Sequence, residues 1–313
     1  MCLIKFGIQC ENYYHRGEKA EIFENIKRMA RFAEDGGVDS FWVPDHLMQI
    51  PSAGDLNEPM LEGWVTISSL SQVTRRIMLG TLVSGIIYRS PALLAKMGST
   101  LDVISGGRLL MGIGAGWFEL EAMAYGINFY PAQERLLRLK ESVQIIREMW
   151  SRERSTFIGQ YYQVEDAYCN PRPVQLPHPP IIIGGNSKTV LDLVSRYADG
   201  CNLYNGSPEM VKGQLETLKN YCRISNRDYD GLIRSRLGRL IIGSQEEVSA
   251  GLGRCGVIDE KMNYPVYGTP EQVRASIRAF VDAGLDYLIF NFEPGTEEKS
   301  LKLFTEEVIP YFK

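Results

Sequence analysis

The chain alternates short β-rich runs with longer amphipathic segments, and this rhythm restricts its possible folds more than any other feature. Hydrophobic runs rich in β-branched residues are typical of strands, whereas apolar residues at helical spacing predict amphipathic helices. The predicted strands are residues 4–9, 40–44, 77–84, 108–113, 180–183, 200–204, 238–242 and 286–290. The predicted helices are residues 18–36, 64–73, 91–104, 131–151, 209–222, 269–283 and 297–308, and one further helix follows residues 184–187 and ends near residue 197.

Eight strands separated by helices are the number that closes a parallel barrel. Several strands are apolar without alternation, as expected when helices cover the outer face of a parallel sheet. The sequence therefore predicts an α/β fold, a (β/α)₈ TIM barrel forming a single domain over residues 1–313. A doubly wound open sheet is the alternative, but eight regular units without a break favour closure.

Two segments are longer than a minimal strand–helix unit requires. Residues 155–180 contain a glycine and a proline run and predict an inserted hairpin, whereas residues 244–267 are glycine-rich without clear periodicity. Insertions that follow barrel strands often build the C-terminal mouth, so we expect both to contribute there. The alternative is surface decoration or an oligomer contact.

Composition excludes several classes of function. The net charge is −4, and no basic block suited to nucleic acid occurs along the chain. No apolar stretch reaches the length of a membrane span, and the N-terminus lacks a signal-peptide pattern, so we expect a cytoplasmic protein. The six scattered cysteines then read as free thiols. Motifs for metal binding and for a serine nucleophile are absent, and we expect no metal.

The three histidines differ in their candidacy for chemistry. His178 lies in a proline run and is interpreted as structural, and His15 follows the first strand. His46 comes directly after the second strand, on the catalytic face of a barrel, and follows Asp45. A neighbouring carboxylate can hold an imidazole for proton transfer, which makes His46 the candidate catalytic residue.

Two glycine clusters follow later strands. In Met111–Trp117 (MGIGAGW) the dinucleotide-binding spacing is broken by the tryptophan, so the glycines there indicate a close approach of backbone to a packed neighbour or a flat ligand. The run Gly184-Gly185-Asn186-Ser187 precedes a helix, and exposed backbone N–H groups at a helix N-terminus form a natural phosphate site.

Taken together, these segments resemble the luciferase-like monooxygenase and F420-dependent oxidoreductase superfamily. The resemblance covers nearly the whole chain and is strongest over residues 40–202. It rests on SFWVPDH at 40–46, EPMLEGWVTISSLSQVTRRIMLGTLVSG at 58–85, YRSPALLAKMGSTLDVISGGRLLMGIGAGW at 88–117, CNPRPVQLPHPPIIIGG at 169–185 and SRYADG at 195–200.

The resemblance implies a flavin or deazaflavin at the barrel mouth, with His46 near the redox-active ring. It implies a bulge with a non-proline cis peptide at the end of the third strand. The cofactor-binding residues that it implies are Asp45, Leu82, Val83, Ser84, Ala115, Gly116, Gly184, Gly185, Ser187 and Lys188. One position departs from the sugar-phosphate dehydrogenases, which have a catalytic glutamate where this chain has Trp117; Glu119 and Glu121 are nearby but out of register.

Asp-His followed by an apolar residue favours coenzyme F420, with FMN as the alternative. The resemblance implies an oxidoreductase that transfers a hydride between F420 and a small organic substrate. The alternatives are an FMN-dependent monooxygenase fed by a separate reductase, and a flavin-binding protein without turnover. The resemblance also implies a homodimer through the helices near the second and third strands. A separate flavin or F420 reductase is a further candidate partner.

Overall fold

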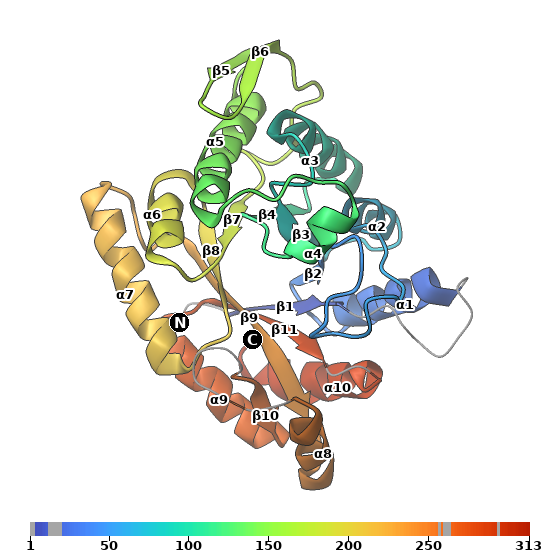
Figure 1. The fold of residues 1–313 in the computed structure, drawn as a ribbon. Helices are drawn as coiled ribbons and strands as arrows, with labels where there is room; N and C mark the ends of the chain where they lie inside the picture. The colour runs from blue at the N-terminus through green and yellow to red at the C-terminus, as the bar shows by residue number, and fades with distance from the viewer. Residues whose placement is uncertain (1–3, 12–20, 256–257, 259–263, 293–294) are drawn as a thin grey trace.

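In the computed structural model the sheet closes on itself as a parallel barrel (Figure 1). The structure describes residues 4–11, 21–255, 258, 264–292 and 295–313. Within them, the barrel strands in chain order are β1 (Lys5–Gln9), β2 (Ser40–Val43), β3 (Met78–Gly85), β4 (Leu109–Gly114), β7 (Ile181–Gly184), β8 (Gly200–Tyr204), β9 (Ile233–Ile242) and β11 (Tyr287–Phe292). Neighbouring strands pair in that order, and β11 pairs with β1, which closes the ring. The predicted (β/α)₈ barrel is confirmed.

Helices follow the strands and cover the outside of the barrel (Figure 1). They are α1 (Ile22–Asp35), α2 (Gly63–Ser71), α3 (Pro91–Ser105), α5 (Ala132–Ser151), α6 (Lys188–Tyr197), α7 (Pro208–Ile224), α9 (Pro270–Asp282) and α10 (Glu297–Leu303). Their N-termini carry the expected signals: Ser90 caps α3 with a proline next to it, and Thr269 with Gln272 forms a capping box on α9.

Alternate residues of each strand divide the core into two parts. The side chains that fill the barrel interior include Trp42, Leu82, Leu110, Ile182, Leu237, Tyr287 and Ile289. The opposite set, including Phe6, Phe41, Ile113 and Phe290, packs against the helices. Interior positions nearer the C-terminal ends of several strands are glycine or polar residues, among them Gly112, Gly184, Arg239 and Asn291.

Strand β9 begins five residues before the predicted start at residue 238, and two arginines explain the error. Arg234 forms a salt bridge with Asp286, with Nη2 2.7 Å from Oδ2. Arg236 is fully buried on the outer face of the strand, with its guanidinium carbon 4.4 Å from the ring centroid of Phe280. Charged residues in a buried strand hide it from a hydrophobicity pattern.

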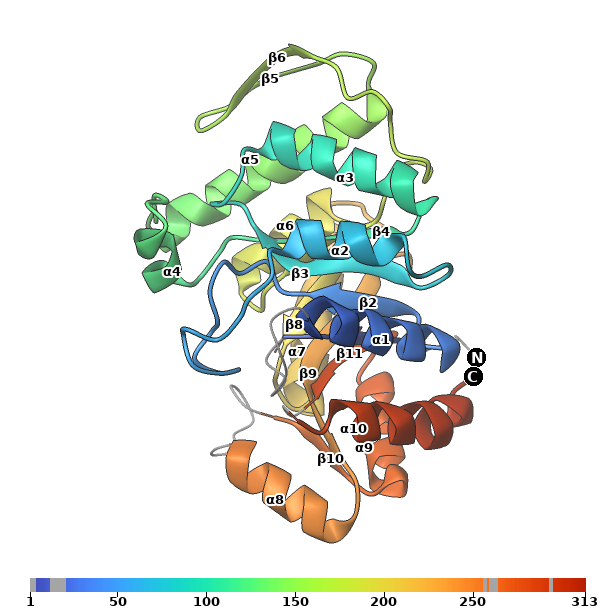
Figure 2. The ribbon, with the colours of Figure 1, turned by 90° about the vertical axis from the view of Figure 1, so that its right-hand side faces the viewer.

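The two insertions predicted from the sequence form different structures. Residues 155–180 contain the predicted hairpin, β5 (Ser155–Ile158) and β6 (Gln163–Ala167), but Figure 2 shows it outside α3 and α5 rather than at the mouth. Glu141 of α5 fixes its tip by accepting N–H groups from Gln160, Tyr161 and Tyr162. For the first insertion, the alternative of surface decoration therefore holds.

The second insertion contains a helix that periodicity did not predict, α8 (Gln245–Cys255), followed by the short strand β10 (Val266–Gly268) beside β9. A further short helix, α4 (Glu119–Ala124), follows β4 and was also not predicted. In Figure 2, α4 and the loop that follows β2 lie on the side of the barrel away from the two chain termini. This side carries the C-terminal strand ends.

Candidate active site

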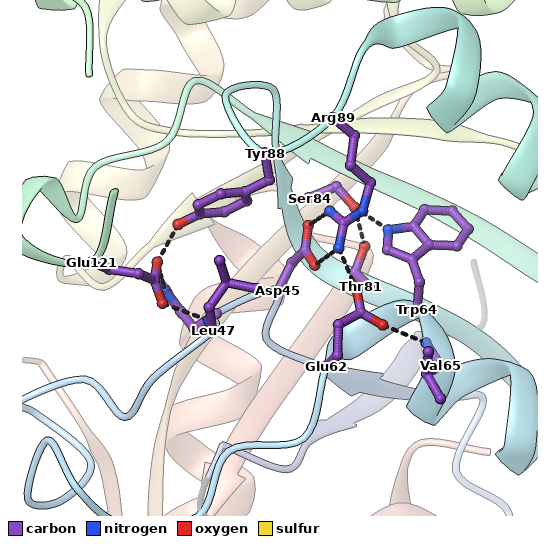
Figure 3. A network of polar contacts seen from close by, with 11 residues as sticks. Asp45, Leu47, Glu62, Trp64, Val65, Thr81, Ser84, Tyr88, Arg89 and Glu121 are labelled. Carbon is purple, nitrogen blue, oxygen red and sulfur yellow. Dashed lines mark hydrogen bonds and ion pairs between the residues drawn. The ribbon is translucent and has the colours of Figure 1, made fainter. Parts of the chain in front are cut away.

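Asp45 and His46 follow β2, and each pairs with a residue from a different segment of the chain. Figure 3 shows Asp45 with its partner Arg89. Asp45 is buried and receives a bidentate contact from Arg89, with Nη1–Oδ2 2.7 Å and Nη2–Oδ1 3.0 Å. Burial outweighs this contact and raises the pKa of Asp45 to about 6. The expectation that Asp45 holds the imidazole of His46 is wrong, because both of its oxygens are taken by Arg89.

Glu121 of α4 performs that task instead. Its Oε2 lies 3.0 Å from Nδ1 of His46 and also accepts the hydroxyl of Tyr88. Its Oε1 accepts the N–H groups of Leu47 and Met48 at 2.5 and 3.1 Å. Burial acts to raise the pKa of Glu121, but the hydrogen bonds from His46 and Tyr88 outweigh it and hold the pKa below its usual value. An ionised carboxylate only accepts, so Nδ1 of His46 carries the proton.

The other ring nitrogen of His46, Nε2, has no hydrogen-bond partner among the residues that the structure describes. The ring meets the edges of Trp117 and Phe118, with centroids 5.4 and 6.0 Å away. These two aromatic rings stack on each other, and Trp117 is 59% exposed. His46 is thus held through Nδ1 between a buried carboxylate and an aromatic pair, with Nε2 available for proton exchange.

Arg89 and Tyr88 connect this part of the mouth to the helices around it (Figure 3). Arg89 also contacts Glu62, and Glu62 accepts the N–H of Val65 at 2.7 Å, which caps α2. Two adjacent residues of the β3–α3 loop therefore hold Asp45 and the Glu121–His46 pair in place.

The end of β3 carries the predicted irregularity. The peptide bond between Leu82 and Val83 is cis, and the pairing with β4 shifts between Thr81 and Ser84. Ser84 is buried, and its Oγ lies 2.6 Å from Oγ1 of Thr81 and 2.9 Å from Nε1 of Trp64. The backbone carbonyl of Leu82 accepts from the amide of Gln9 at 2.8 Å. Ser84 and Leu82 thus fix the bulge, and Val83 remains partly exposed.

Glycines of β4 and β7 make room for the Val83 side chain. A Cβ on Gly114 would lie 2.6 Å from Cγ2 of Val83, and one on Gly184 would lie 3.0 Å from its Cγ1. A Cβ on Gly112 would lie 2.1 Å from the carbonyl oxygen of Thr81. We call Val83 with Gly112, Gly114 and Gly184 the glycine wall. The glycines accommodate a packed neighbour, and the partly exposed members of the wall, Val83 and Gly184, carry no charge.

The loop beyond the glycine wall leads to the N-terminus of α6. Ser187 is the N-cap and accepts the N–H of Val190 at 3.2 Å. Ser187 and Lys188 are both exposed, and Gly185 has a positive φ of 137°. Ala115 and Gly116 follow β4 and are partly exposed. The predicted phosphate-binding residues therefore meet at an exposed helix N-terminus next to the glycine wall.

The opposite half of the mouth is polar and was not predicted. Glu11, which follows β1, accepts Nδ2 of Asn291 of β11 at 2.8 Å and lies 3.4 Å from Nη2 of Arg239 of β9. Burial is the main cause of a raised pKa of Glu11. Tyr204 is the last residue of β8, which pairs with β9, and burial and then the charge of Glu11 raise its pKa. We call Glu11, Tyr204, Arg239 and Asn291 the polar wall.

The structure also places His178 and four of the six cysteines. His178 is structural, since it is buried with Nδ1 2.9 Å from the carbonyl of Pro179. His15 lies outside the described residues. The cysteines whose side chains are described, Cys10, Cys169, Cys201 and Cys222, are buried and form no disulfide bond. In the described part of the chain, no group of three potential metal ligands converges, and no helix has the length and apolar character that crossing a bilayer requires.

The sequence profile of the luciferase-like monooxygenase family matches residues 4–250. The chain belongs to this family. Its relatives differ in chemistry. An F420-dependent glucose-6-phosphate dehydrogenase of Amycolatopsis mediterranei (strain U-32) is 26% identical over 308 residues, covering 89% of this chain and 91% of the relative. An FMNH(2)-dependent dimethylsulfone monooxygenase of Pseudomonas putida is 26% identical over 257 residues, covering 71% of this chain and 70% of the relative.

The fold also matches solved structures. An F420-dependent secondary alcohol dehydrogenase, solved in complex with an F420-acetone adduct, superposes with a TM-score of 0.85 at 19% identity and covers 99% of both chains. At this identity the likeness shows the shared barrel alone.

Proposed function

We propose that this protein is an oxidoreductase that transfers a hydride between coenzyme F420 and a small organic substrate, with His46 exchanging a proton with the substrate. The observation that carries the proposal is the position of His46. It follows β2, between the polar wall on β1 and the glycine wall on β3, and Glu121 leaves its Nε2 free of partners among the described residues. F420-dependent and FMN-dependent relatives both support a redox enzyme.

The residues present fit a cofactor with a flat ring and a phosphate-bearing tail. The glycine wall offers an uncharged surface for the ring, and the exposed N–H groups of α6 with Lys188 suit the phosphate. When bound, the cofactor supplies a ring that accepts or donates a hydride. Asp45 would act on it indirectly, through the loop that Arg89 fixes.

The protein's own share of the reaction is positioning and proton transfer. As the carbon–hydrogen bond of an alcohol loses its hydride, Nε2 of His46 takes the hydroxyl proton, and the ionised Glu121 stabilises the resulting imidazolium. In the reverse direction the same nitrogen returns the proton to the carbonyl oxygen. Trp117 lies where sugar-phosphate dehydrogenases have glutamate, and Glu121 is buried under His46, so we propose a substrate other than glucose 6-phosphate.

The test is a titration of the purified protein with F420 and with FMN, followed by fluorescence quenching. We expect micromolar F420 binding that Lys188→Ala weakens and Gln163→Ala, on the exposed hairpin, leaves unchanged. Binding of FMN alone, with oxygen consumption in the presence of FMNH₂, would instead identify a monooxygenase supplied by a separate reductase. If F420 binds tightly but no activity is found that His46→Ala abolishes, the protein is a binding protein without turnover.

We further propose that the protein is a homodimer. The support is a set of exposed apolar side chains on the outer faces of α2 and α3: Val65, Leu93, Val103 and Ile104. These helices follow β2 and β3, as the family resemblance implies.

A further inference from the structure

The polar wall consists of side chains from four different segments that meet inside the mouth. Glu11 follows β1 and Tyr204 ends β8. Arg239 and Asn291 lie within β9 and β11, and these four strands are neighbours in the closed sheet. Arg239 and Asn291 are paired in register across β9 and β11. Glu11 follows β1 and His46 follows β2, and these two strands pair in parallel, so the wall and the proposed proton-exchanging residue lie at neighbouring strand ends.

The ion pair within this wall is loose. Nη2 of Arg239 lies 3.4 Å from Oε1 of Glu11 and 3.4 Å from the carbonyl of Ser52. Charge-assisted hydrogen bonds usually measure about 2.7–2.9 Å. The two side chains are only 21% and 11% exposed. A buried ion pair offsets its desolvation only with good geometry and further hydrogen bonds, so this pair is poorly explained as a stabilising element.

Asn291 gives a second, independent indication that the wall is incomplete. It is 6% exposed and donates Nδ2 to Glu11. Its Oδ1 has no hydrogen-bond partner among the residues that the structure describes. A buried acceptor without a donor destabilises the folded protein, and a ligand donor can recover this loss after a small rearrangement of the wall.

We propose that the polar wall binds a second, non-reacting hydroxyl group of a neutral substrate. A hydroxyl both donates and accepts, so it can donate to Glu11 or Asn291 and accept from Arg239. A substrate carboxylate would be repelled by Glu11, and an ammonium group by Arg239. The adjacent cation and anion therefore select a neutral group with both functions. The inference rests on the proposed function for the place of the reacting hydroxyl at His46.

The experiment measures binding by isothermal titration calorimetry, first without cofactor and then with F420 present. The ligands are a matched series: 1-phenylethanol, 1-phenylethane-1,2-diol, 1-phenylpropane-1,3-diol, mandelate and 2-amino-1-phenylethanol. They share a benzylic alcohol, and their aromatic ring suits the exposed face of Trp117 beside Phe118. They differ in the group offered to the polar wall, and the propanediol places its second hydroxyl one carbon further out.

We expect one of the two diols to bind at least about 10-fold more tightly than 1-phenylethanol, mandelate and the amino alcohol, because a site built for a hydroxyl discriminates against analogues that lack it. Asn291→Leu, which is close to isosteric, should remove most of this preference, and Gln163→Leu on the hairpin should not. Arg239→Lys keeps the charge beside Glu11 but loses the planar fork of donors, so it should also reduce the preference for a diol. This variant keeps the test available if Asn291→Leu does not fold.

A preference for mandelate or for the amino alcohol, equal binding of all five ligands, binding of none of them, or a diol preference that survives both wall variants would overturn the assignment. Failure of the proposed function would give a different result in the same experiment. If the diol preference is present but F420 does not bind, the polar wall stands and the cofactor assignment does not.

Discussion

At the scale of single residues, the mouth is organised by carboxylates whose partners differ from those that the sequence indicated. Asp45 neighbours His46 in sequence but pairs with Arg89, whereas Glu121, 75 residues away, holds the imidazole. Burial alone would disfavour both charges. Glu121 has four hydrogen-bond donors, and its pKa is lowered, whereas Asp45 depends on a single arginine and its pKa is raised. The difference allows separate tests of the two groups.

Glu121→Gln tests the role of Glu121 as a positioning residue. The amide cannot stabilise the imidazolium by charge, so we expect kcat to fall about 10- to 100-fold with KM changed little. The ¹⁵N shifts of His46, which report the protonated ring nitrogen, should show Nδ1–H in the wild type and a mixture of tautomers in the variant. Glu119→Gln, in the first turn of the same helix, is the control. Unchanged tautomer and kcat would contradict the role.

The raised pKa of Asp45 gives a pH dependence with a definite sign. Between its unfolded value near 4 and its folded value of about 6, the folded protein binds more protons at Asp45 than the unfolded chain. The free energy of unfolding therefore rises as the pH falls through this window. From pH 7 to pH 5, Asp45 should contribute a gain of about 1 kcal/mol.

Urea unfolding of the wild type and Asp45→Asn at both pH values measures this gain. The pH-dependent gain should be smaller by about that amount in Asp45→Asn, whereas Asp192→Asn on α6 should behave as the wild type does. An equal or larger gain in Asp45→Asn would show that Asp45 titrates at a much lower pH.

At the scale of elements, strands β3, β4 and β7 act as one unit. The bulge at Leu82–Val83 displaces Val83 toward its neighbours, and glycines on the two adjacent strands accommodate it. Side chains at those positions would contact Val83 or the backbone of β3. The glycine wall is therefore a packing requirement of the strands as well as the surface proposed for the cofactor ring.

Gly114→Ala tests this coupling. Its Cβ would lie 2.6 Å from Val83, and overpacking of this kind costs about 1–3 kcal/mol. We expect a lower Tm and F420 binding weakened by about 10-fold or more. Adding Val83→Ala should restore much of both losses because it removes the atoms in conflict. If the double variant is no better than the single one, Val83 is not the cause.

At the scale of the whole molecule, the outer faces of α2 and α3 expose apolar side chains that do not pack against the rest of the described chain. Val65 is 68% exposed and Leu93 is 52% exposed, on helices adjacent in the outer layer. Apolar side chains gathered on neighbouring helices indicate a contact with another protein surface.

The double variant Val65→Glu and Leu93→Glu should convert the proposed homodimer into a monomer, because burying two unpaired charges at an interface is strongly unfavourable. Size-exclusion chromatography with light scattering measures the mass. Ile158→Glu, on the exposed hairpin, is the matched control. A monomeric wild type, or a dimer unaffected by the double variant, would contradict the proposal.

Much of the fold could be predicted because its signals are local. Strand and helix patterns, the capping box at Thr269 and the glycines after strands each arise within a few residues. The errors have physical causes. Arg234 and Arg236 hide the first half of β9, and α4 is too short to show periodicity. The family resemblance supplied the cis bond, which no local pattern of this chain predicts.

The sequence by itself determined the barrel, the placement of His46 at a strand end and the glycine runs beside it. Only the tertiary structure decided which groups meet there. Glu121 reaches His46 and Glu11 reaches Asn291, 280 residues away, because closing the barrel brings loops from distant strands to one mouth. Such contacts depend on the relative positions of whole elements, which no short-range pattern encodes. The Asp-His pair was visible in the sequence, and its separation into two different networks was not.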